Sequence, residues 1–107
     1  MYYIYILRCH DQSLYIGITT DLKRRFHEHI NKKGAKYTRV HTPLFIEASW
    51  SCADRSLASK LEYRLKKLSK KEKENLIHDF EYDIQPLLDI DKKCYERLNK
   101  DEMKVII

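Results

Sequence analysis

Apolar and polar positions alternate in the first twenty residues. Tyr2 to Arg8 is rich in aromatic and β-branched residues, and from Leu14 to Thr19 the aliphatic side chains fall on every second position. Both patterns predict β-strands. The segment between them, Cys9 to Ser13, holds turn-forming residues, so we expect the two strands to form a hairpin.

The register of this hairpin decides which side chains share a face of the sheet. With a two-residue turn at Asp11-Gln12, Tyr5 and Tyr15 point to opposite faces. A three-residue loop, or one bulge, shifts the parity, so that Tyr5, Leu7, Tyr15 and Gly17 share a face. The pattern of the sequence leaves both registers open.

A helix is predicted directly after the hairpin, with Thr20 or Asp21 as its N-cap. Its apolar stripe repeats every four residues, at Leu22, Phe26 and Ile30. Gly34 is a typical signal for the end of a helix. Residues 32–43 are then expected to form a basic loop, and residues 44–50 a third strand.

Two serine-to-acid spacings predict the starts of two further helices. They are the capping boxes Ser51-x-x-Asp54 and Ser69-x-x-Glu72. The second of these helices is expected to run to about His78. The apolar positions of the first are Leu57, Ala58, Leu61, Leu65 and Leu68.

The order β-β-α-β-α-α mixes strands and helices without a βαβ repeat, which predicts the α+β class. Beyond residue 78 the pattern favours a helical extension, because Pro86 can open a helix. The apolar residues that follow at helical spacing are Leu87, Ile90, Cys94 and Leu98. We therefore expect one domain over residues 1–78 and a helical C-terminal extension over residues 79–107.

Length and composition exclude several classes of protein. A chain of 107 residues forms one small domain, and no apolar run approaches the roughly 20 residues of a membrane span. Met1 is followed at once by a strand-like segment without a basic region, so we expect no secretory leader. Three cysteines, Cys9, Cys52 and Cys94, cannot all be paired, which favours a reducing compartment. The expected location is the cytoplasm.

The charge is distributed unevenly along the chain. The whole chain has a net charge of +5, but residues 1–78 hold 16 Lys and Arg against 8 Asp and Glu, a net +8. Residues 79–107 hold 5 against 8, a net −3. We therefore expect a polyanionic partner for the first part. The acidic extension either packs as a terminal helix or covers the basic groove and competes with nucleic acid.

Three polar residues on the predicted helices could carry chemistry. Arg25 and His29 are four residues apart and so project from one face of the first helix. Glu62 lies at the edge of the buried face of the next helix, where a carboxylate is costly unless it is paired or bound to a cation. Its simplest partner is Lys66 or Arg64.

Four motifs in this order resemble the GIY-YIG nuclease superfamily. They are Tyr3-Ile4-Tyr5, Tyr15-Ile16-Gly17, Arg25-x-x-x-His29 and Glu62, and the resemblance covers about residues 2–78. Residues 34–38, Gly-Ala-Lys-Tyr-Thr, look like the small stand-alone bacterial branch related to structure-specific endonuclease subunits. Tyr3 stands where the name-giving motif has glycine.

The resemblance implies a three-stranded antiparallel sheet flanked by helices, with Tyr5 and Tyr15 together on the active face. It also implies hydrolysis of phosphodiester bonds in DNA with one Mg²⁺ or Mn²⁺ ion on Glu62. Arg25 would neutralise the phosphate, Tyr5 would be the general base, and Tyr15 and His29 would orient water or phosphate. Further nucleic-acid contacts are expected from Gly17, Lys23, Arg24, Lys32, Lys33, Lys36, Tyr37 and Arg39.

A tyrosine base needs a physical justification, because ionising a phenol at pH 7 costs about 3 pKa units, or roughly 4 kcal/mol. One cation at about 4 Å in an effective dielectric of 20 returns a similar amount. Arg25, His29, Lys36 and a metal ion are the available cations. We therefore expect Tyr5 to act as a base in a cationic pocket.

Two other functions remain open. The chain could be a nucleic-acid-binding module that keeps the fold but cleaves poorly, or a subunit that needs a partner protein. The joint presence of Tyr5, Tyr15, Arg25, His29 and Glu62 favours the enzyme, because binding alone requires neither Glu62 nor paired tyrosines. The expected substrates are branched, nicked or single-stranded DNA, in repair or recombination.

Overall fold

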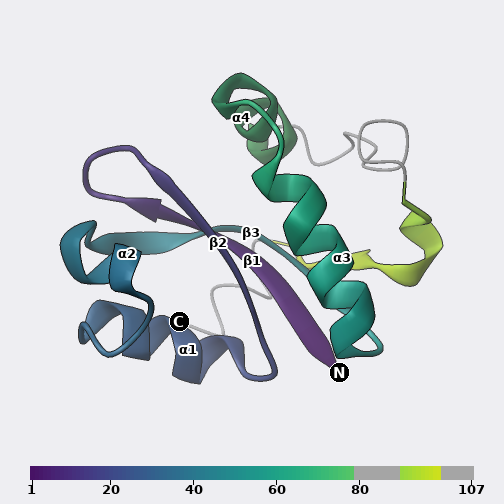
Figure 1. Cartoon of the computed structure of the whole chain (residues 1–107), viewed down its shortest axis with the longest axis horizontal. Helices are drawn as coiled ribbons and strands as arrows, with labels where there is room; N and C mark the ends of the chain where they lie inside the picture. The colour runs from purple at the N-terminus through teal and green to yellow at the C-terminus, as the bar shows by residue number, and fades with distance from the viewer. Residues whose placement is uncertain (79–89, 100–107) are drawn as a thin grey trace.

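A computed structural model describes residues 1–78 and 90–99 of the chain. Its centre is an antiparallel sheet of four strands in the order β2-β1-β3-β4 (Figure 1). The strands are β1 (Tyr2–Cys9), β2 (Leu14–Thr19), β3 (Pro43–Cys52) and β4 (Glu96–Arg97). The predicted α+β class is confirmed, although the sheet has a fourth strand that the sequence pattern did not indicate.

The hairpin between β1 and β2 has a three-residue loop, His10 to Gln12. The amide of Cys9 donates to the carbonyl of Ser13 at 2.9 Å, and Gln12 has a left-handed φ of 69°. A left-handed residue at the end of a three-residue loop is a common hairpin geometry. Tyr5 therefore lies opposite Gly17, as expected for a three-residue loop.

In this register the two tyrosines share a face. Leu7 lies opposite Tyr15 on the same face as the pair Tyr5 and Gly17. Of the two registers that the sequence left open, the structure has the one that brings Tyr5 and Tyr15 together. The arrangement implied by the family resemblance is confirmed in this respect.

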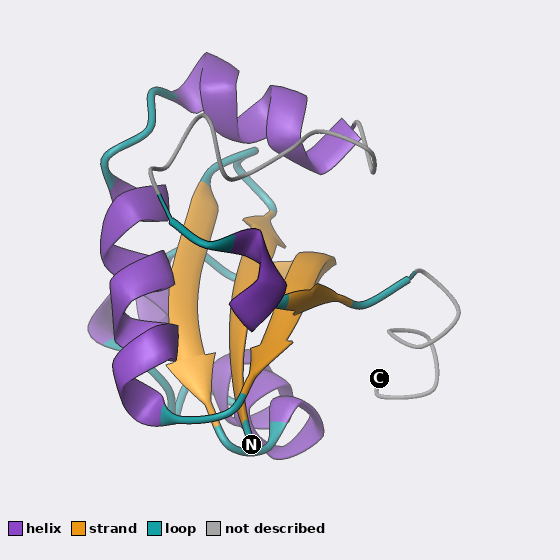
Figure 2. Ribbon diagram, turned by 90° about the vertical axis from the view of Figure 1, so that its right-hand side faces the viewer, coloured by secondary structure: helices purple, strands orange, loops and turns teal. Residues whose placement is uncertain are grey.

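Helices cover both faces of the sheet (Figures 1 and 2). Helix α1 (Leu22–Ile30) packs on the face of Tyr5, where Leu22 and Phe26 meet Leu7 and Ile46. Helices α3 (Arg55–Lys66) and α4 (Lys70–His78) pack on the other face. The buried residues there include Ile4, Ile6, Ile16, Ala48, Trp50, Ala58, Leu61, Leu65 and Leu76.

The N-cap of α1 is Asp21, whose side chain accepts from the amide of Arg24 at 3.1 Å. The predicted end at Gly34 is wrong, because the helix ends at Ile30 and Lys32 takes the left-handed φ of 60°. The predicted apolar stripe is also wrong at Ile30, which is 39% exposed. Steps of four residues rotate around the helix by about 40° each, whereas a residue seven positions after Leu22 returns to its face. That residue is His29, which is fully buried.

The segment predicted as a basic loop contains a short helix, α2 (Lys36–Val40). Its sequence has no apolar stripe, and the residue that it buries is Thr38. Its N-cap, Ala35, makes no capping side-chain hydrogen bond. The usual sequence signals of a helix are therefore missing here, and the prediction of a loop was wrong for these five residues.

The starts of α3 and α4 differ in how well the sequence predicted them. The box at Ser51 is wrong: Ser51 stays in β3, and Asp54 caps α3 by accepting from the amide of Leu57 at 2.9 Å. The box at Ser69 is confirmed. The Ser69 hydroxyl accepts from the amide of Glu72 at 3.1 Å, and the Glu72 carboxylate accepts from the amide of Ser69 at 3.0 Å.

Residues 90–99 do not form the predicted helix. They form a short 3-10 turn (Lys92–Cys94) followed by β4, which pairs with β3 at the edge opposite β2. Ile90 packs with the α3 face of the sheet and Leu98 with the α1 face, while Cys94 is exposed. A single helix could not place these side chains on opposite faces of the sheet.

The other parts of the expected extension, Pro86 and Leu87 included, lie outside the described residues, and its boundary at residue 79 stays a prediction. Among residues 1–78 and 90–99, no helix is long and apolar enough to cross a membrane. The three cysteines are free thiols.

Candidate active site

A chain of buried hydrogen bonds connects β1, α1 and α2. The Tyr5 hydroxyl lies 2.8 Å from Nε2 of His29, and Nδ1 of His29 lies 2.7 Å from Oγ1 of Thr38. The Thr38 hydroxyl donates to the carbonyl of Ala35 at 2.9 Å. A tyrosine of the sheet is thus tied to the loop before α2 through a fully buried histidine.

This chain fixes the tautomer of His29. Because the Thr38 hydroxyl gives its single proton to Ala35, its oxygen can only accept from His29. Nδ1 of His29 therefore carries the proton in the neutral ring, and Nε2 has a free lone pair. It follows that the Tyr5 hydroxyl donates to Nε2 of His29.

The two glycines of the chain lie against this pair of side chains. A Cβ atom on Gly17 would stand 2.5 Å from the hydroxyl oxygen of Tyr5. A Cβ atom on Gly34 would press on Nδ1 of the His29 ring, closer than real Cβ atoms approach other groups. Gly17 is itself buried and lies beneath Tyr5. Gly34 makes room for the His29 ring and does not end α1.

Burial controls the protonation of both partners. It raises the pKa of Tyr5 above the ordinary value, with a further increase from Tyr15, and the guanidinium of Arg25 only partly offsets this. Burial and the charge of Arg25 lower the pKa of His29 to about 4. Tyr5 is therefore a phenol and His29 a neutral imidazole at pH 7.

Of the cations expected around a tyrosinate, Arg25 acts on Tyr5, whereas His29 and Lys36 do not contribute as expected. His29 contributes no positive charge because it is neutral, and Lys36 is exposed on α2. The cost of removing a phenolate from water exceeds the attraction of Arg25. Besides the guanidinium of Arg25, the pocket offers Tyr5 a proton acceptor, Nε2 of His29.

Aromatic rings extend the site from this buried pair towards solvent. The ring of Tyr15 lies 6.4 Å from that of Tyr5 and 5.2 Å from that of His29. Tyr37 stacks on Tyr15 at 5.8 Å, and His41 stacks on Tyr37 at 4.0 Å. Because Tyr37 is 37% exposed, the stack ends at the surface.

Arg25 and Glu62 bring opposite charges to the tyrosine pair. Arg25 lowers the pKa of both Tyr5 and Tyr15, whereas Glu62 raises both. Arg25 is held by Glu28, with 3.0 Å between Nη1 and Oε1. Glu62 forms the simple ion pair expected from the sequence, 3.4 Å from Nζ of Lys66. The structure therefore brings together all five residues expected to carry the chemistry.

Glu62 is suited to hold a divalent cation. Its side chain is 24% exposed and so can be reached from solvent, and its ion-pair partner Lys66 is itself exposed. Among the residues that the structure describes, no three His, Cys, Asp or Glu side chains form a metal cluster. Mg²⁺ keeps several waters and binds through one or two carboxylates plus substrate phosphates, so this donor set fits one such ion.

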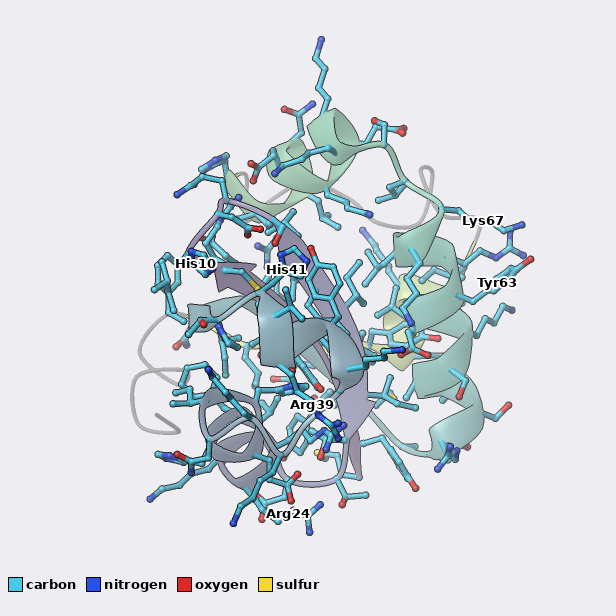
Figure 3. All side chains as sticks on the ribbon, turned by 60° about the vertical axis from the view of Figure 1, so that its left-hand side comes forward. His10, Arg24, Arg39, His41, Tyr63 and Lys67 are labelled. Carbon is cyan, nitrogen blue, oxygen red and sulfur yellow. The ribbon has the colours of Figure 1, made fainter. Side chains whose placement is uncertain are left out.

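The cations expected to contact nucleic acid are all exposed, and they lie on α1, on α2 and on the turn between them. Figure 3 shows Arg24, Arg39 and His41 on one side of the molecule, with Arg39 between the other two in that view. The six cations expected to contact nucleic acid are called the basic surface from here on. They are Lys23, Arg24, Lys32, Lys33, Lys36 and Arg39.

Sequence reasoning missed three residues that shape the site. Thr38 fixes the tautomer of His29, Glu28 holds Arg25, and Gly34 leaves space for the His29 ring. Thr38 and Gly34 are within the loop motif used for the family resemblance. The spacing of Arg25 and Glu28 on one helix turn was the available signal for that ion pair.

Comparison with known proteins agrees with the family resemblance seen in the sequence. The model of the GIY-YIG catalytic domain matches residues 1–75. A UPF0213 protein of Fusobacterium nucleatum is 49% identical over 76 residues, which cover 71% of this chain and 76% of that protein. A UPF0213 protein of Halalkalibacterium halodurans is 45% identical over 76 residues, which cover 71% of this chain and 81% of that protein.

One solved structure is also similar, the solution NMR structure of the UPF0213 protein BH0048 from Bacillus halodurans. It has a TM-score of 0.48 and 44% sequence identity, and covers 73% of this chain and 84% of that one. The matched family model extends over most of the described chain. It includes the five residues expected to carry the chemistry, Tyr5, Tyr15, Arg25, His29 and Glu62. The domain is therefore of nuclease type, and the chain belongs to the GIY-YIG family.

Proposed function

We propose that the chain is an endonuclease that hydrolyses phosphodiester bonds in DNA with the help of one divalent cation. The observation that carries the proposal is the hydrogen bond from Tyr5 to the neutral, tautomerically fixed His29, with the charges of Arg25 and Glu62 acting on Tyr5. A phosphodiester is hydrolysed very slowly without a catalyst, so the site has to supply well over 10 kcal/mol, at about 1.4 kcal/mol per tenfold in rate.

Tyr5 and His29 together take the proton of the attacking water. As the water oxygen forms its bond to phosphorus, one of its protons passes to the Tyr5 oxygen, and the proton of Tyr5 passes to Nε2 of His29. The bond from phosphorus to the 3′ oxygen breaks, and that oxygen takes up a proton from solvent. No free phenolate has to form, which agrees with the raised pKa of Tyr5. Because the pKa of His29 is about 4, its imidazolium is transient: it returns its proton to Tyr5, and Tyr5 releases one proton to solvent.

Arg25 stabilises the charge that develops on the phosphate, for which a forked guanidinium is well shaped. Tyr15 lies beside both members of the proton-accepting pair and is placed to orient water or phosphate. A divalent cation on Glu62, Mg²⁺ or Mn²⁺, would supply Lewis-acid stabilisation of the phosphate and of the leaving oxygen.

The selectivity of the enzyme is proposed to depend on the shape of the DNA. The basic surface offers cations for phosphates, and the described residues contain no helix-turn-helix or zinc finger that could read bases in the major groove. Branched, nicked and single-stranded DNA, as formed in repair and recombination, are the proposed substrates.

The test is cleavage of a panel of forks, flaps, nicked duplexes and single strands, with an RNA strand for comparison. The protein is incubated with Mg²⁺ or Mn²⁺, and the control contains EDTA. Metal-dependent cuts in branched or nicked DNA support the proposal. Binding without cleavage in every metal would instead identify a binding module, or a subunit that needs a partner protein.

A further inference from the structure

A second polar cleft lies beside the candidate active site. It has a volume of about 280 Å³ and is shallow and open to solvent. Its walls come from the start of β1, the end of β2, α1 and the start of α3. The polar side chains that line it include Thr19, Arg24, Arg25, Glu28 and Arg55, with the ring of Tyr2 as an aromatic wall.

The charge of this cleft is strongly positive. Three guanidinium groups face one carboxylate, that of Glu28, which is already paired with Arg25 at 3.0 Å. Arg24 and Arg55 are exposed, and within residues 1–78 and 90–99 neither forms an ion pair. Two arginines from different helices thus line one hollow without an acidic ion-pair partner of their own, an arrangement that attracts an anion.

The position of the cleft relates it to the reaction. Arg25 belongs both to the cleft and to the charges that act on Tyr5. Arg55 precedes Glu62 by seven residues on α3, which is two helical turns or about 10 Å along the axis. The cleft and the candidate active site therefore share Arg25 and lie side by side at the β2 edge of the sheet.

We infer that this cleft binds a backbone phosphate of the DNA strand, next to the phosphate that is cleaved. Arg24 and Arg55 hold the phosphate oxygens by paired N–H donors, Thr19 lies at its side, and Tyr2 offers a ring face to the attached nucleoside. A volume just below the range for ligand pockets, roughly 300–1,000 Å³, suits a phosphate with its sugar better than a whole cofactor. Arg55 thereby becomes part of the DNA-binding surface, which the sequence had limited to Gly17, α1 and residues 32–39.

The inference rests on the proposed function for the identity of the ligand, but it can be tested without catalysis. Binding of a fluorescent nicked duplex is measured in EDTA, for the full chain and for Arg55→Gln and Arg24→Gln. Each substitution removes one charge from an exposed side chain, so the fold is retained. We expect a loss of affinity of about five- to tenfold for each variant, and a salt slope smaller by about 1.

The matched control is Lys71→Gln, which removes one charge from an exposed residue of α4, on the other side of the sheet from α1. Its affinity should stay within twofold of that of the unchanged chain. A substitution with the opposite sign is Glu28→Gln, which removes the one carboxylate of the cleft. It should tighten binding several-fold in EDTA, an effect that a merely structural role for Glu28 would not produce.

Two results would overturn the inference. One is a loss of affinity for Arg55→Gln and Arg24→Gln no larger than for Lys71→Gln. The other is saturation of the cleft by inorganic phosphate, seen as chemical-shift changes at Arg55, with DNA affinity unaffected by either substitution, which would make it a site for free phosphate. Failure of the proposed function looks different, because the arginine variants would then lower DNA binding while the unchanged chain cleaves nothing.

Discussion

The hydroxyl of Tyr5 lies 2.8 Å from Nε2 of His29, and each of the two side chains rests against a glycine, Gly17 or Gly34. Two residues 24 positions apart in sequence therefore form one buried unit whose protons are ordered by Thr38. In the proposed mechanism, this unit lets a tyrosine with a raised pKa accept a proton from water, since its own proton has an acceptor at hydrogen-bond distance.

Thr38→Val tests whether this proton order matters. Without the hydroxyl, the N–H at Nδ1 of His29 loses its acceptor, and the other tautomer places a proton on Nε2, opposite the donor of Tyr5. We expect cleavage to fall about 10- to 100-fold and the free energy of unfolding to fall by about 1–3 kcal/mol. Thr38→Ser keeps the hydroxyl and should retain most of the activity. Equal cleavage rates for the two variants would argue against a role for the tautomer.

The lowered pKa of His29 predicts a specific dependence of stability on pH. The folded protein has a pKa of about 4 at this residue and the unfolded chain about 6.5, so the unfolded state binds the additional proton between these values. The contribution of His29 to the free energy of unfolding is therefore fully present above pH 6.5. It is lost as the pH decreases to 4, which lowers the free energy of unfolding by up to roughly 3 kcal/mol. Urea titrations at pH 7.5, 6.5, 5.5 and 4.5 measure it.

The control for this titration is the exposed neighbour His27, for which His27→Gln should leave the pH dependence unchanged. A free energy of unfolding that is flat between pH 7.5 and 4.5 would mean that His29 is protonated equally easily in the folded and unfolded chains. That result would contradict the buried neutral imidazole.

Glu62→Ala tests the proposed metal ligand. Removing the carboxylate deletes the Lewis-acid contribution but leaves the basic surface intact, so cleavage should be abolished while DNA affinity in EDTA changes by no more than a few-fold. Lys66→Ala removes the ion-pair partner of Glu62 and is expected to keep cleavage. Cleavage by Glu62→Ala at a rate near that of the unchanged chain would reject Glu62 as the ligand.

The basic surface predicts that DNA binding depends steeply on salt. If about four of its six cations contact phosphates, the logarithm of the binding constant should fall with the logarithm of the salt concentration with a slope near −3 to −4. Fluorescence anisotropy with a duplex at 50–300 mM salt gives this slope. A slope near zero would remove nucleic acid from the list of partners.

Much of the fold could be predicted because its signals are local. The strand pattern of residues 2–8 and 14–19, the Asp21 cap and the Ser69 box each depend on neighbours in sequence, and the structure contains them all. The family resemblance selected the register that places Tyr5 opposite Gly17. The pattern alone could not do so, since the register depends on the left-handed conformation of one loop residue, Gln12.

The remaining features depend on contacts between distant segments. His29 reads as a polar residue beside an apolar stripe, and only its hydrogen bonds to Tyr5 and Thr38 make its full burial possible. Helix α2 has no apolar stripe. The residue that it buries is Thr38, whose hydroxyl bonds to His29. The spacing of Ile90, Cys94 and Leu98 resembles a helix, yet Cys94 ends a 3-10 turn, Ile90 lies before that turn, and Leu98 follows the edge strand β4.

Tyr5→Phe tests the central claim most directly, because it removes one hydroxyl and leaves the ring that packs with Leu7, Leu22 and Phe26. Cleavage of a nicked duplex in Mg²⁺ or Mn²⁺ is measured beside the melting temperature and the DNA affinity in EDTA. The account predicts that the rate falls at least 100-fold while the variant stays folded and binds DNA within a few-fold of the unchanged chain. A folded Tyr5→Phe protein that cleaves at a rate near that of the unchanged chain would contradict it.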